Sequence, residues 1–337
     1  MKRSHVMSYG AALGAAVLAR GLARRWTAYD VRGKVALITG GSRGLGLVIA
    51  RELAARGARV AICARRRDEL ERARRDLVQH GGDVFAVECD LTIPSEIATL
   101  VALVTEYFGP IDMLINNAGV IQVGPMELME LEDYEEAMAM HFWAPLHLMR
   151  AVIPDMIARG GGRIVNVTSI GGKIAVPHLL PYTASKFALV GLSEGVRVEL
   201  ARRGIGVTTV VPGLMRTGSP RNAWFKGQHR AEHAWFAIGD SLRLTSMDAR
   251  RAARRVVRAL RHGDPEVILS IQAQIASRLY ALAPGLAQRV LGLVNRLLPE
   301  PGGIGTAREP GSRSESAAAP SFWTRASDRA AARNNQL

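Results

Sequence analysis

The fold of this 337-residue chain is decided by the stretch VALITGGSRGLG at residues 35–46. Its first part, Val35–Thr39, predicts a short apolar strand, and Leu45–Arg56 then predicts a helix. The glycines between them permit a tight turn and let a pyrophosphate approach the backbone, while the helix N-terminus supplies amide donors. Because the glycines stand between a strand and its helix, they indicate a dinucleotide-binding loop more strongly than a plain turn. The residues expected to contact the cofactor here are Gly40, Ser42, Arg43, Gly44, Leu45 and Gly46.

Downstream of this loop the chain alternates apolar strand-like runs with helix-like runs. Further strands are predicted at Arg59–Ala64, Val84–Cys89, Asp112–Ile115, Arg163–Thr168, Val207–Val211 and Glu266–Ser270. Helices are predicted to follow them, including long ones at Leu131–Ala158 and Tyr182–Arg202 and a basic one at Arg250–Arg261. Repeated β-α units imply a parallel sheet with helices on both faces. We therefore predict an α/β protein with a Rossmann-type doubly wound sheet, in a single domain over 31–270 that carries N- and C-terminal extensions.

The two ends of the chain differ from this domain. Residues 1–30 form a leader whose uncharged run, Val6–Ala19, is flanked by basic residues but is shorter than the roughly 20 residues that span a bilayer. We expect a membrane-surface anchor or a docked helix there. Residues 271–300 predict an amphipathic helical extension with a basic polar face, for which core packing, dimer contact and membrane contact all remain open. Residues 301–337 are rich in Gly, Pro, Ser, Ala and Arg and predict a disordered tail.

The composition limits the partners. The formal net charge of +14 favours an anionic partner, unless it reflects an arginine-rich proteome. Nucleic-acid binding is not expected, because the arginines at 250–261 lack interleaved aromatic residues. Cys63 and Cys89 lie in apolar runs and predict buried reduced thiols, and no metal-ligand spacing occurs. We expect a cytoplasmic protein that contacts a membrane, if at all, through residues 1–25 or 271–298.

The end of the second strand predicts which dinucleotide binds. It carries Arg65-Arg66-Arg67, with none of the acidic residues that commonly bind the ribose 2′-hydroxyl of NAD. Arginines favour a 2′-phosphate through charge and paired hydrogen bonds, and Arg43 points to the same end of the cofactor. We therefore predict NADP(H) over NAD(H), with a solvated helix start as the alternative.

Tyr182 and Lys186 indicate the chemistry, together with Ser169 upstream. Residues i and i+4 share a helix face, so the lysine ammonium is expected to lower the pKa of the phenol from about 10 towards neutrality. Such a tyrosine can exchange a proton with an alcohol oxygen at ordinary pH. A surface pair of no consequence is the alternative for this spacing taken alone.

Taken together, residues 33–270, about 70% of the chain, resemble the classical short-chain dehydrogenase/reductase (SDR) family. The motifs that carry the resemblance are Thr39-Gly-x-x-x-Gly-x-Gly46, Asp90-Leu91, Asn116-Asn117-Ala118-Gly119, Ser169, Tyr182-x-x-x-Lys186 and Pro212-Gly213. The resemblance implies that Tyr182 is the general acid or base, that Lys186 lowers its pKa and holds the nicotinamide ribose, and that Ser169 binds the substrate oxygen. It further implies cofactor contacts from Asp90, Leu91, Asn117, Ala118, Gly119, Pro212, Gly213 and Thr217.

One position departs from the family pattern. His141 stands where the family usually has an asparagine that completes a water-mediated proton relay to the lysine. Histidine can also donate and accept, so we count His141 among the catalytic residues, with simple packing as the alternative. Pro145, four residues after His141, is expected to bend or break the helix. The resemblance also implies a homodimer or homotetramer, through pairing of the helices 131–158 and 182–202.

The segment after Pro212 predicts the kind of substrate. In the family it forms a lid over the substrate, and here, over about 214–245, it is rich in Leu, Met, Trp and Phe. We therefore expect an NADP(H)-dependent oxidoreductase that interconverts a carbonyl and a secondary alcohol on an apolar small molecule. Lys226 and His229 in the same segment leave acidic or acyl-carrier-bound substrates open. An NADP-binding scaffold with weak catalysis is the alternative function.

Overall fold

The computed structural model describes residues 28–242, 245–319, 321 and 324–337. The predicted membrane-surface anchor within residues 1–25 lies outside this range. None of the helices in the described ranges has both the length and the apolar composition required to cross a bilayer.

A seven-stranded sheet forms the centre of the molecule, in the order β11-β7-β6-β4-β1-β2-β3, and all its neighbouring strands are parallel. Its strands are β1 (Val35–Thr39), β2 (Arg59–Ala64), β3 (Asp83–Glu88), β4 (Met113–Asn116), β6 (Gly162–Val167), β7 (Ile205–Val211) and β11 (Glu266–Ile268). The chain runs outward from β1 to β3 and then returns to β4 on the other side of β1. This reversal opens a crevice at the carboxyl ends of β1 and β4, where ligands bind in such sheets. The predicted doubly wound fold is confirmed.

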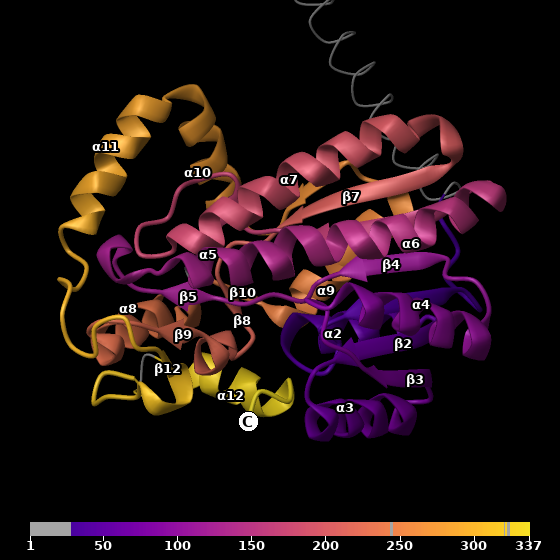
Figure 1. Cartoon of the computed structure of the whole chain (residues 1–337), viewed down its shortest axis with the longest axis horizontal. Coiled ribbons are helices and arrows are strands. Elements are labelled where there is room, and N and C mark those ends of the chain that lie inside the picture. The colour runs from indigo at the N-terminus through magenta and orange to yellow at the C-terminus, as the bar shows by residue number, and fades with distance from the viewer. Residues whose placement is uncertain (1–27, 243–244, 320, 322–323) are drawn as a thin grey trace, which may run out of the picture.

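Helices cover both faces of the sheet (Figure 1). One face packs on α2 (Gly44–Ala54), α3 (Arg67–Gln79) and α9 (Ala249–His262). The other packs on α4 (Pro94–Phe108), α6 (Ala144–Ala158) and α7 (Leu180–Leu200). Successive residues of β1 explain this arrangement, because Ala36 and Ile38 point into the first core while Val35 and Leu37 point into the second. Both faces are apolar, as a buried parallel sheet requires.

The helix predicted over Leu131–Ala158 is divided into α5 (Leu131–Met138) and α6 by a wide π-helical turn at Ala139–Trp143. Pro145 lies in the first turn of α6 and has no N–H to donate to the carbonyl four residues before it. The chain accommodates this loss with the wider turn, in which the Ala144 N–H bonds the Ala139 carbonyl. The expected break in the helix is therefore a π-helical turn on the N-terminal side of Pro145, and this turn contains His141.

The lid after Pro212 comprises β8 (Met215–Arg216), a 3-10 turn at Ser219–Asn222, β9 (Trp224–Phe225) and α8 (His229–Ser241). Strand β8 pairs with β10 (Met247–Asp248). Strand β9 pairs with β5 (Gln122–Val123) on one side and with β12 (Glu309–Pro310) on the other. The lid is thus held by the domain and by the C-terminal segment.

The prediction of a disordered tail over 301–337 is wrong for the described residues. They form β12, a 3-10 turn at Gly311–Arg313 and α12 (Arg325–Arg333), which lie against the lid (Figure 1). The small residues that indicated disorder are the ones that allow close packing. A Cβ at Gly311 would lie 1.9 Å from the Pro220 carbonyl oxygen, and one at Gly218 would lie 2.5 Å from Ala331.

The predicted amphipathic extension forms two helices, α10 (Ile271–Leu282) and α11 (Pro284–Asn295), which meet at the expected break. We call this pair the α10–α11 hairpin; it projects from one end of the domain (Figure 1). No residue of α11 is buried, and Leu282, Leu286 and Leu297 are 82%, 64% and 86% exposed. Packing against the described residues therefore does not account for the apolar face of α11.

Candidate active site

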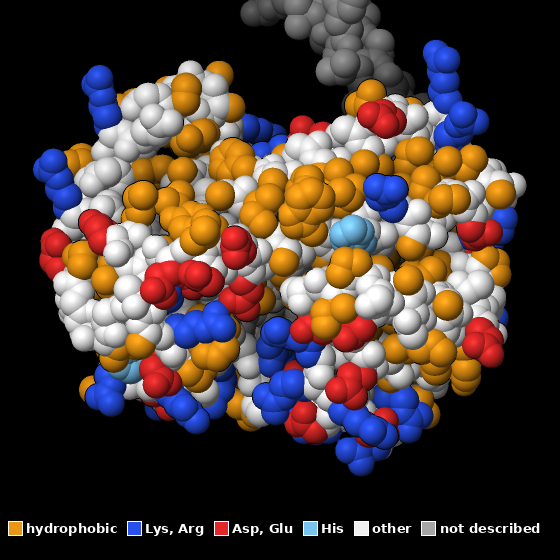
Figure 2. Space-filling model, in the orientation of Figure 1, with side chains coloured by type: hydrophobic (Ala, Val, Ile, Leu, Met, Phe, Trp, Pro, Cys, Tyr) orange, Lys and Arg blue, Asp and Glu red, His pale blue; other side chains and the backbone are white. Residues whose placement is uncertain are grey.

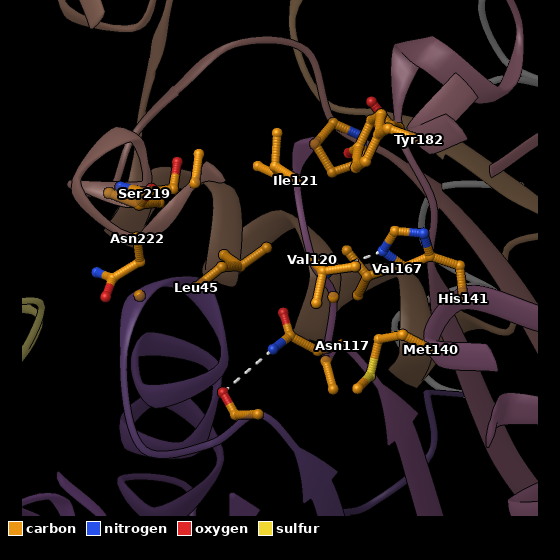
Figure 3. Close-up of a pocket in the computed structure, with 18 of the residues that line it drawn as sticks. Leu45, Asn117, Val120, Ile121, Met140, His141, Val167, Tyr182, Ser219 and Asn222 are labelled. Atoms are coloured by element: carbon orange, nitrogen blue, oxygen red, sulfur yellow. Dashed lines mark hydrogen bonds between the residues drawn. The ribbon is translucent and has the colours of Figure 1, made fainter. Parts of the chain in front are cut away.

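A cleft of about 370 Å³ lies at the carboxyl ends of the central strands, between the glycine loop and the lid. Figure 3 shows Tyr182 and His141 on one side of it and Ser219 and Asn222 on the other. The predicted site residues that line it are Gly40, Ser42, Arg43, Gly44, Leu45, Arg65, Leu91, Asn117, Ala118, Gly119, His141, Ser169, Tyr182, Lys186, Pro212, Gly213 and Thr217. The structure thus brings together residues that are far apart in the sequence.

Two predicted cofactor residues, Gly46 and Asp90, do not line the cleft. Gly46 is required for packing, because a Cβ there would lie 2.2 Å from the Gly40 carbonyl oxygen. The Asp90 carboxylate accepts hydrogen bonds from the backbone N–H and the hydroxyl of Thr92, at 2.9 and 2.8 Å. Gly46 and Asp90 therefore stabilise the segments that form the cleft wall without lining the cleft themselves.

The glycine loop has the shape that a dinucleotide phosphate needs. Gly40 and Gly44 have φ angles of 62° and 57°, a region that favours glycine. A Cβ at Gly40 would also approach the Ala118 Cα to 3.0 Å. Thr39 ties the end of β1 to the segment after β4, because its hydroxyl accepts from the N–H groups of Asn117 and Ala118 at 2.9 and 3.0 Å. The residues present therefore fit an NAD(P) cofactor, whose phosphates would lie at the N-terminus of α2.

The charged residues of the cleft lie at its phosphate end, beside the glycine loop. Arg43, Arg65 and Arg66 line the cleft, but so does Glu69, which the sequence interpretation missed. One Glu69 oxygen lies 3.0 Å from the Arg43 guanidinium and 3.2 Å from that of Arg66. Arg43 also donates to the Asn222 side chain at 2.7 Å, and burial lowers the pKa of its guanidinium. In the described part of the chain, no carboxylate pairs with Arg65.

Ser169 and Tyr182 meet at the opposite end of the cleft. Ser169 follows the end of β6, and Tyr182 lies in the first turn of α7. The pKa of Tyr182 is raised to about 12, chiefly by burial; the hydrogen bond with Ser169 opposes this shift, and the nearby Asp240 adds to it. The Ser169 oxygen also accepts from the Gly171 N–H at 3.0 Å. Both hydroxyls therefore face the same point of the cleft in neutral form.

In the ligand-free protein, burial is the largest influence on the pKa of Tyr182, and the influences that accompany it come from Ser169 and Asp240 and not from Lys186. The Lys186 ammonium lies 5.7 Å from the centre of the Tyr182 ring and donates to the Val167 carbonyl at 3.0 Å. Burial lowers the pKa of Lys186 to about 7, and no carboxylate in the described residues pairs with it. With a pKa of about 7, the Lys186 amine is about half charged near pH 7, so it offers the phenol less positive charge than an ordinary lysine.

Both ring nitrogens of His141 are occupied. Its Nε2 accepts from the Val120 N–H at 3.1 Å, a bond drawn in Figure 3. Its Nδ1 lies 2.7 Å from the Ser185 hydroxyl, which donates its own hydrogen to the Tyr182 carbonyl at 2.9 Å. His141 is therefore the neutral Nδ1–H tautomer, and burial followed by the nearby Lys186 lowers its pKa well below the usual value. This arrangement favours a positioning role for His141 over a proton relay.

Asp240 on α8 is a further cleft residue that the sequence interpretation missed. Its carboxyl group is buried, and Ser219 donates to it at 3.2 Å. Burial raises its pKa to about 7, against the hydrogen bonds from Ser219 and from the Met215 backbone. Its only sequence signal was its place four residues after Phe236, on the lid face that carries the apolar residues.

The rest of the substrate end is apolar. Its walls come from loops, α7 and the lid, and include Ile121, Val176, Leu179, Leu214, Met215, Ala223, Trp224 and Phe236. The basic lid residues turn away from it. Lys226 is buried against Asp133, with 2.5 Å between nitrogen and oxygen, and His229 lies 3.0 Å from the Ser314 hydroxyl. These two residues therefore offer no charge to an acidic substrate.

A doubly wound sheet, a glycine loop at its crevice and a serine–tyrosine–lysine group define an oxidoreductase that acts on hydroxyl or ketone groups with NAD(P). The short chain dehydrogenase model matches residues 34–226, more than half of the chain, so the chain belongs to this family. It is 32% identical over 265 residues to a dehydrogenase/reductase SDR family protein 7-like of Anopheles gambiae, covering 77% of this chain and 82% of that protein. It is 37% identical over 186 residues to a D-beta-hydroxybutyrate dehydrogenase of Rhizobium meliloti, covering 55% and 72%. A crystal structure of an actinorhodin polyketide ketoreductase variant with NADPH matches with a TM-score of 0.62 and 32% identity, over 70% of this chain and 95% of that one.

Proposed function

We propose that this protein is an NADP(H)-dependent oxidoreductase that interconverts a ketone and a secondary alcohol on an apolar small molecule. The observation that carries the proposal is the convergence of the Ser169 and Tyr182 hydroxyls on one point of a cleft whose remaining substrate wall is apolar. A substrate carbonyl placed there accepts hydrogen bonds from both, which polarises it. NADPH, when bound, supplies the hydride to its carbon.

In the reducing direction Tyr182 gives its phenolic proton to the substrate oxygen, and in the oxidising direction the phenolate takes it back. The neutral phenol is the form that a reductase needs before the reaction, and burial holds it in that form. Lys186, which points into the cleft from the next turn of α7, regains charge when negative charge accumulates beside it. It then stabilises the phenolate that remains after proton transfer.

The preference for NADP(H) rests on Arg43, Arg65 and Arg66, which line the phosphate end of the cleft. The actinorhodin ketoreductase relative carries NADPH, which supports the same choice. Glu69 opposes it, because its carboxylate already pairs with two of these arginines. Asp68 also pairs with Arg66, at 3.2 Å. We propose that the three arginines outweigh these two carboxylates, as the net charge of the group remains positive.

The test is an NADPH-consumption screen over apolar ketones of graded size, with Tyr182→Phe as the inactive variant. Tyr134→Phe, on α5 and outside the cleft, is the matched control. Turnover by wild type and control but not by Tyr182→Phe supports the proposal. NADPH binding without turnover on any ketone would favour the alternative, an NADP-binding scaffold.

We further propose two contacts for the surface. Figure 2 shows orange side chains gathered over the helices α5, α6 and α7 on the viewed face. Leu131 of α5, Trp143 of the π turn and Val198 of α7 are 69%, 51% and 75% exposed, which supports a homodimer or homotetramer through these helices. The α10–α11 hairpin supports peripheral contact of an otherwise cytoplasmic protein with an anionic membrane. Residues 271–299 combine its exposed apolar side chains with three arginines and no acidic residue.

The membrane contact is tested by co-sedimentation with vesicles. Replacing Leu286 and Leu293 with Asp should abolish retention on phosphatidylserine vesicles, and neutral phosphatidylcholine vesicles should retain less wild-type protein. Val78→Asp, at an exposed apolar site of α3 outside the hairpin and outside the proposed oligomer face, is the control. Equal retention of all variants would overturn this contact while leaving the proposed chemistry intact.

A further inference from the structure

The last described residues of the chain lie directly on the glycine loop. We call Asn334, Asn335 and Gln336 the C-terminal strap. The Asn334 carbonyl accepts from the Gly44 N–H at 2.9 Å. The Asn335 side chain donates to the carbonyls of Ser42 and Glu69, at 2.8 and 2.9 Å. Figure 1 shows the C-terminus beside the domain, where the yellow α12 ends.

The strap also holds the lid. The Asn222 side chain donates to the Gln336 side-chain oxygen at 2.6 Å, and the same Asn222 accepts from Arg43. Gln336 is one of the residues that line the cleft. The strap therefore bridges the glycine loop and the lid across the phosphate end of the cleft, which the core domain alone would leave open.

The strap has the features of a specific contact. Asn334 and Gln336 are 6% and 8% exposed, whereas Leu337 is 68% exposed. Asn335 has a φ of 55°, a left-handed conformation that asparagine adopts more readily than most residues. Arg72 donates to its side chain at 2.9 Å. The strap thus bonds the loop through the Asn334 carbonyl and the Asn335 carboxamide, and bonds the lid through the Gln336 carboxamide, without introducing side-chain charge.

The strap uses the groups that a cofactor needs. The Gly44 N–H opens α2 and is one of the free donors at the helix N-terminus that bind phosphate. It is committed to Asn334 in this structure. The Gln336 amide nitrogen lies 2.7 Å from the position of a Cβ on Gly44, so it covers the face of the loop that a pyrophosphate approaches.

We propose that the C-terminal strap competes with the cofactor: it closes the phosphate end of the ligand-free cleft and is displaced when NAD(P) binds. This inference rests on the proposed cofactor site. A closed population lowers the apparent affinity by the fraction of molecules that are open, so the strap sets how readily cofactor enters. Because it also bonds Asn222, its release frees the lid as the cofactor arrives.

The first experiment measures NADPH binding, by fluorescence titration and stopped flow, for the wild type and for a variant that lacks residues 334–337. Removal of the strap should tighten NADPH binding by about tenfold, chiefly through faster association. Deletion of Leu337 alone is the matched control and should change nothing. Asn335→Ala, which keeps the chain length but loses three hydrogen bonds, should give a smaller gain in the same direction.

A second experiment follows the strap itself. Trypsin cleavage after Arg333 releases the strap with Leu337, and intact mass reports the loss. Cleavage should be slow in the ligand-free wild type and faster with saturating NADPH, because binding displaces the strap. Amide exchange at Gly44 should be slow in the ligand-free wild type and faster in the strap deletion.

The outcomes separate the two proposals. Weaker or unchanged NADPH binding in the strap deletion, or protection of the Arg333–Asn334 bond by NADPH, overturns the competition and makes the strap a wall of the site. If wild type and strap deletion alike bind neither NADPH nor NADH, the proposed function fails as well.

Discussion

The two ends of the cleft are built in different ways. The proposed catalytic end joins Ser169, Tyr182, Lys186 and His141. Hydrogen bonds to the loop after β4, to β6 and to α7 hold Lys186 and His141, and burial favours the neutral forms of the titratable groups. The phosphate end is charged and is closed by a residue from the far end of the chain, Gln336. The comparison teaches that burial controls protonation at one end, while competition for hydrogen-bond donors controls access at the other.

The largest effect is expected at the catalytic end, where Tyr182→Phe removes the proton donor. Turnover of an accepted ketone should fall by about 10²–10⁴-fold, because general acid catalysis contributes on that scale. NADPH affinity should stay close to that of the wild type, since the charged end of the cleft is untouched. Steady-state kinetics and fluorescence titration together check this. Activity within threefold of the wild type would show that Tyr182 is not the acid.

Asp240 tests the claim that burial sets protonation at this end. Its pKa is raised from 3.8 to about 7, so the folded state keeps a proton that the unfolded state loses. The contribution of the protonated Asp240 carboxyl to the free energy of unfolding is complete below about pH 4 and is lost as the pH rises through about 7. Between pH 4.5 and 8 the wild type should lose about 3 kcal/mol of unfolding free energy relative to Asp240→Asn. Urea titrations at the two pH values measure it; parallel curves would contradict a buried protonated carboxyl.

His141 distinguishes positioning from proton relay. His141→Ala leaves the buried Val120 N–H without its acceptor and the Ser185 oxygen without its donor, which should destabilise the fold by about 2–3 kcal/mol. His141→Asn retains an acceptor for Val120 and should lose less. The pH profile of turnover should keep its shape in both variants. A profile displaced in His141→Asn at unchanged stability would restore the relay.

The smallest effect concerns charge at the phosphate end. Glu69→Gln removes the carboxylate that pairs with Arg43 and Arg66, so NADPH should bind about fivefold more tightly while NADH changes little. Glu71→Gln, whose partner is Arg74 on the outer side of α3, is the control. The ratio of the two dissociation constants measures the effect. Weaker NADPH binding would mean that Glu69 orients the arginines and does not compete with the phosphate.

Much of the catalytic end could be predicted from sequence because its residues belong to local motifs. Tyr182 and Lys186 share one helix face, and the glycines follow directly from the end of β1. What could not be predicted is how burial acts on them. The separation of Lys186 from the phenol, and the two hydrogen bonds of His141, depend on the positions of Val167, Val120 and Ser185, which come from other elements.

By itself, the sequence determined the parallel sheet, the glycine loop, the proposed serine–tyrosine–lysine trio and the apolar lid. Alternating strand and helix periods and fixed short spacings express these features, and each acts over a few neighbouring residues. Only the tertiary structure decided the protonation of the site, the roles of Glu69 and Asp240, and the place of the tail. The tail has the composition of a disordered segment, yet its small residues let it pack against the lid and reach the glycine loop. Such contacts join residues nearly 300 positions apart, and no local pattern records them.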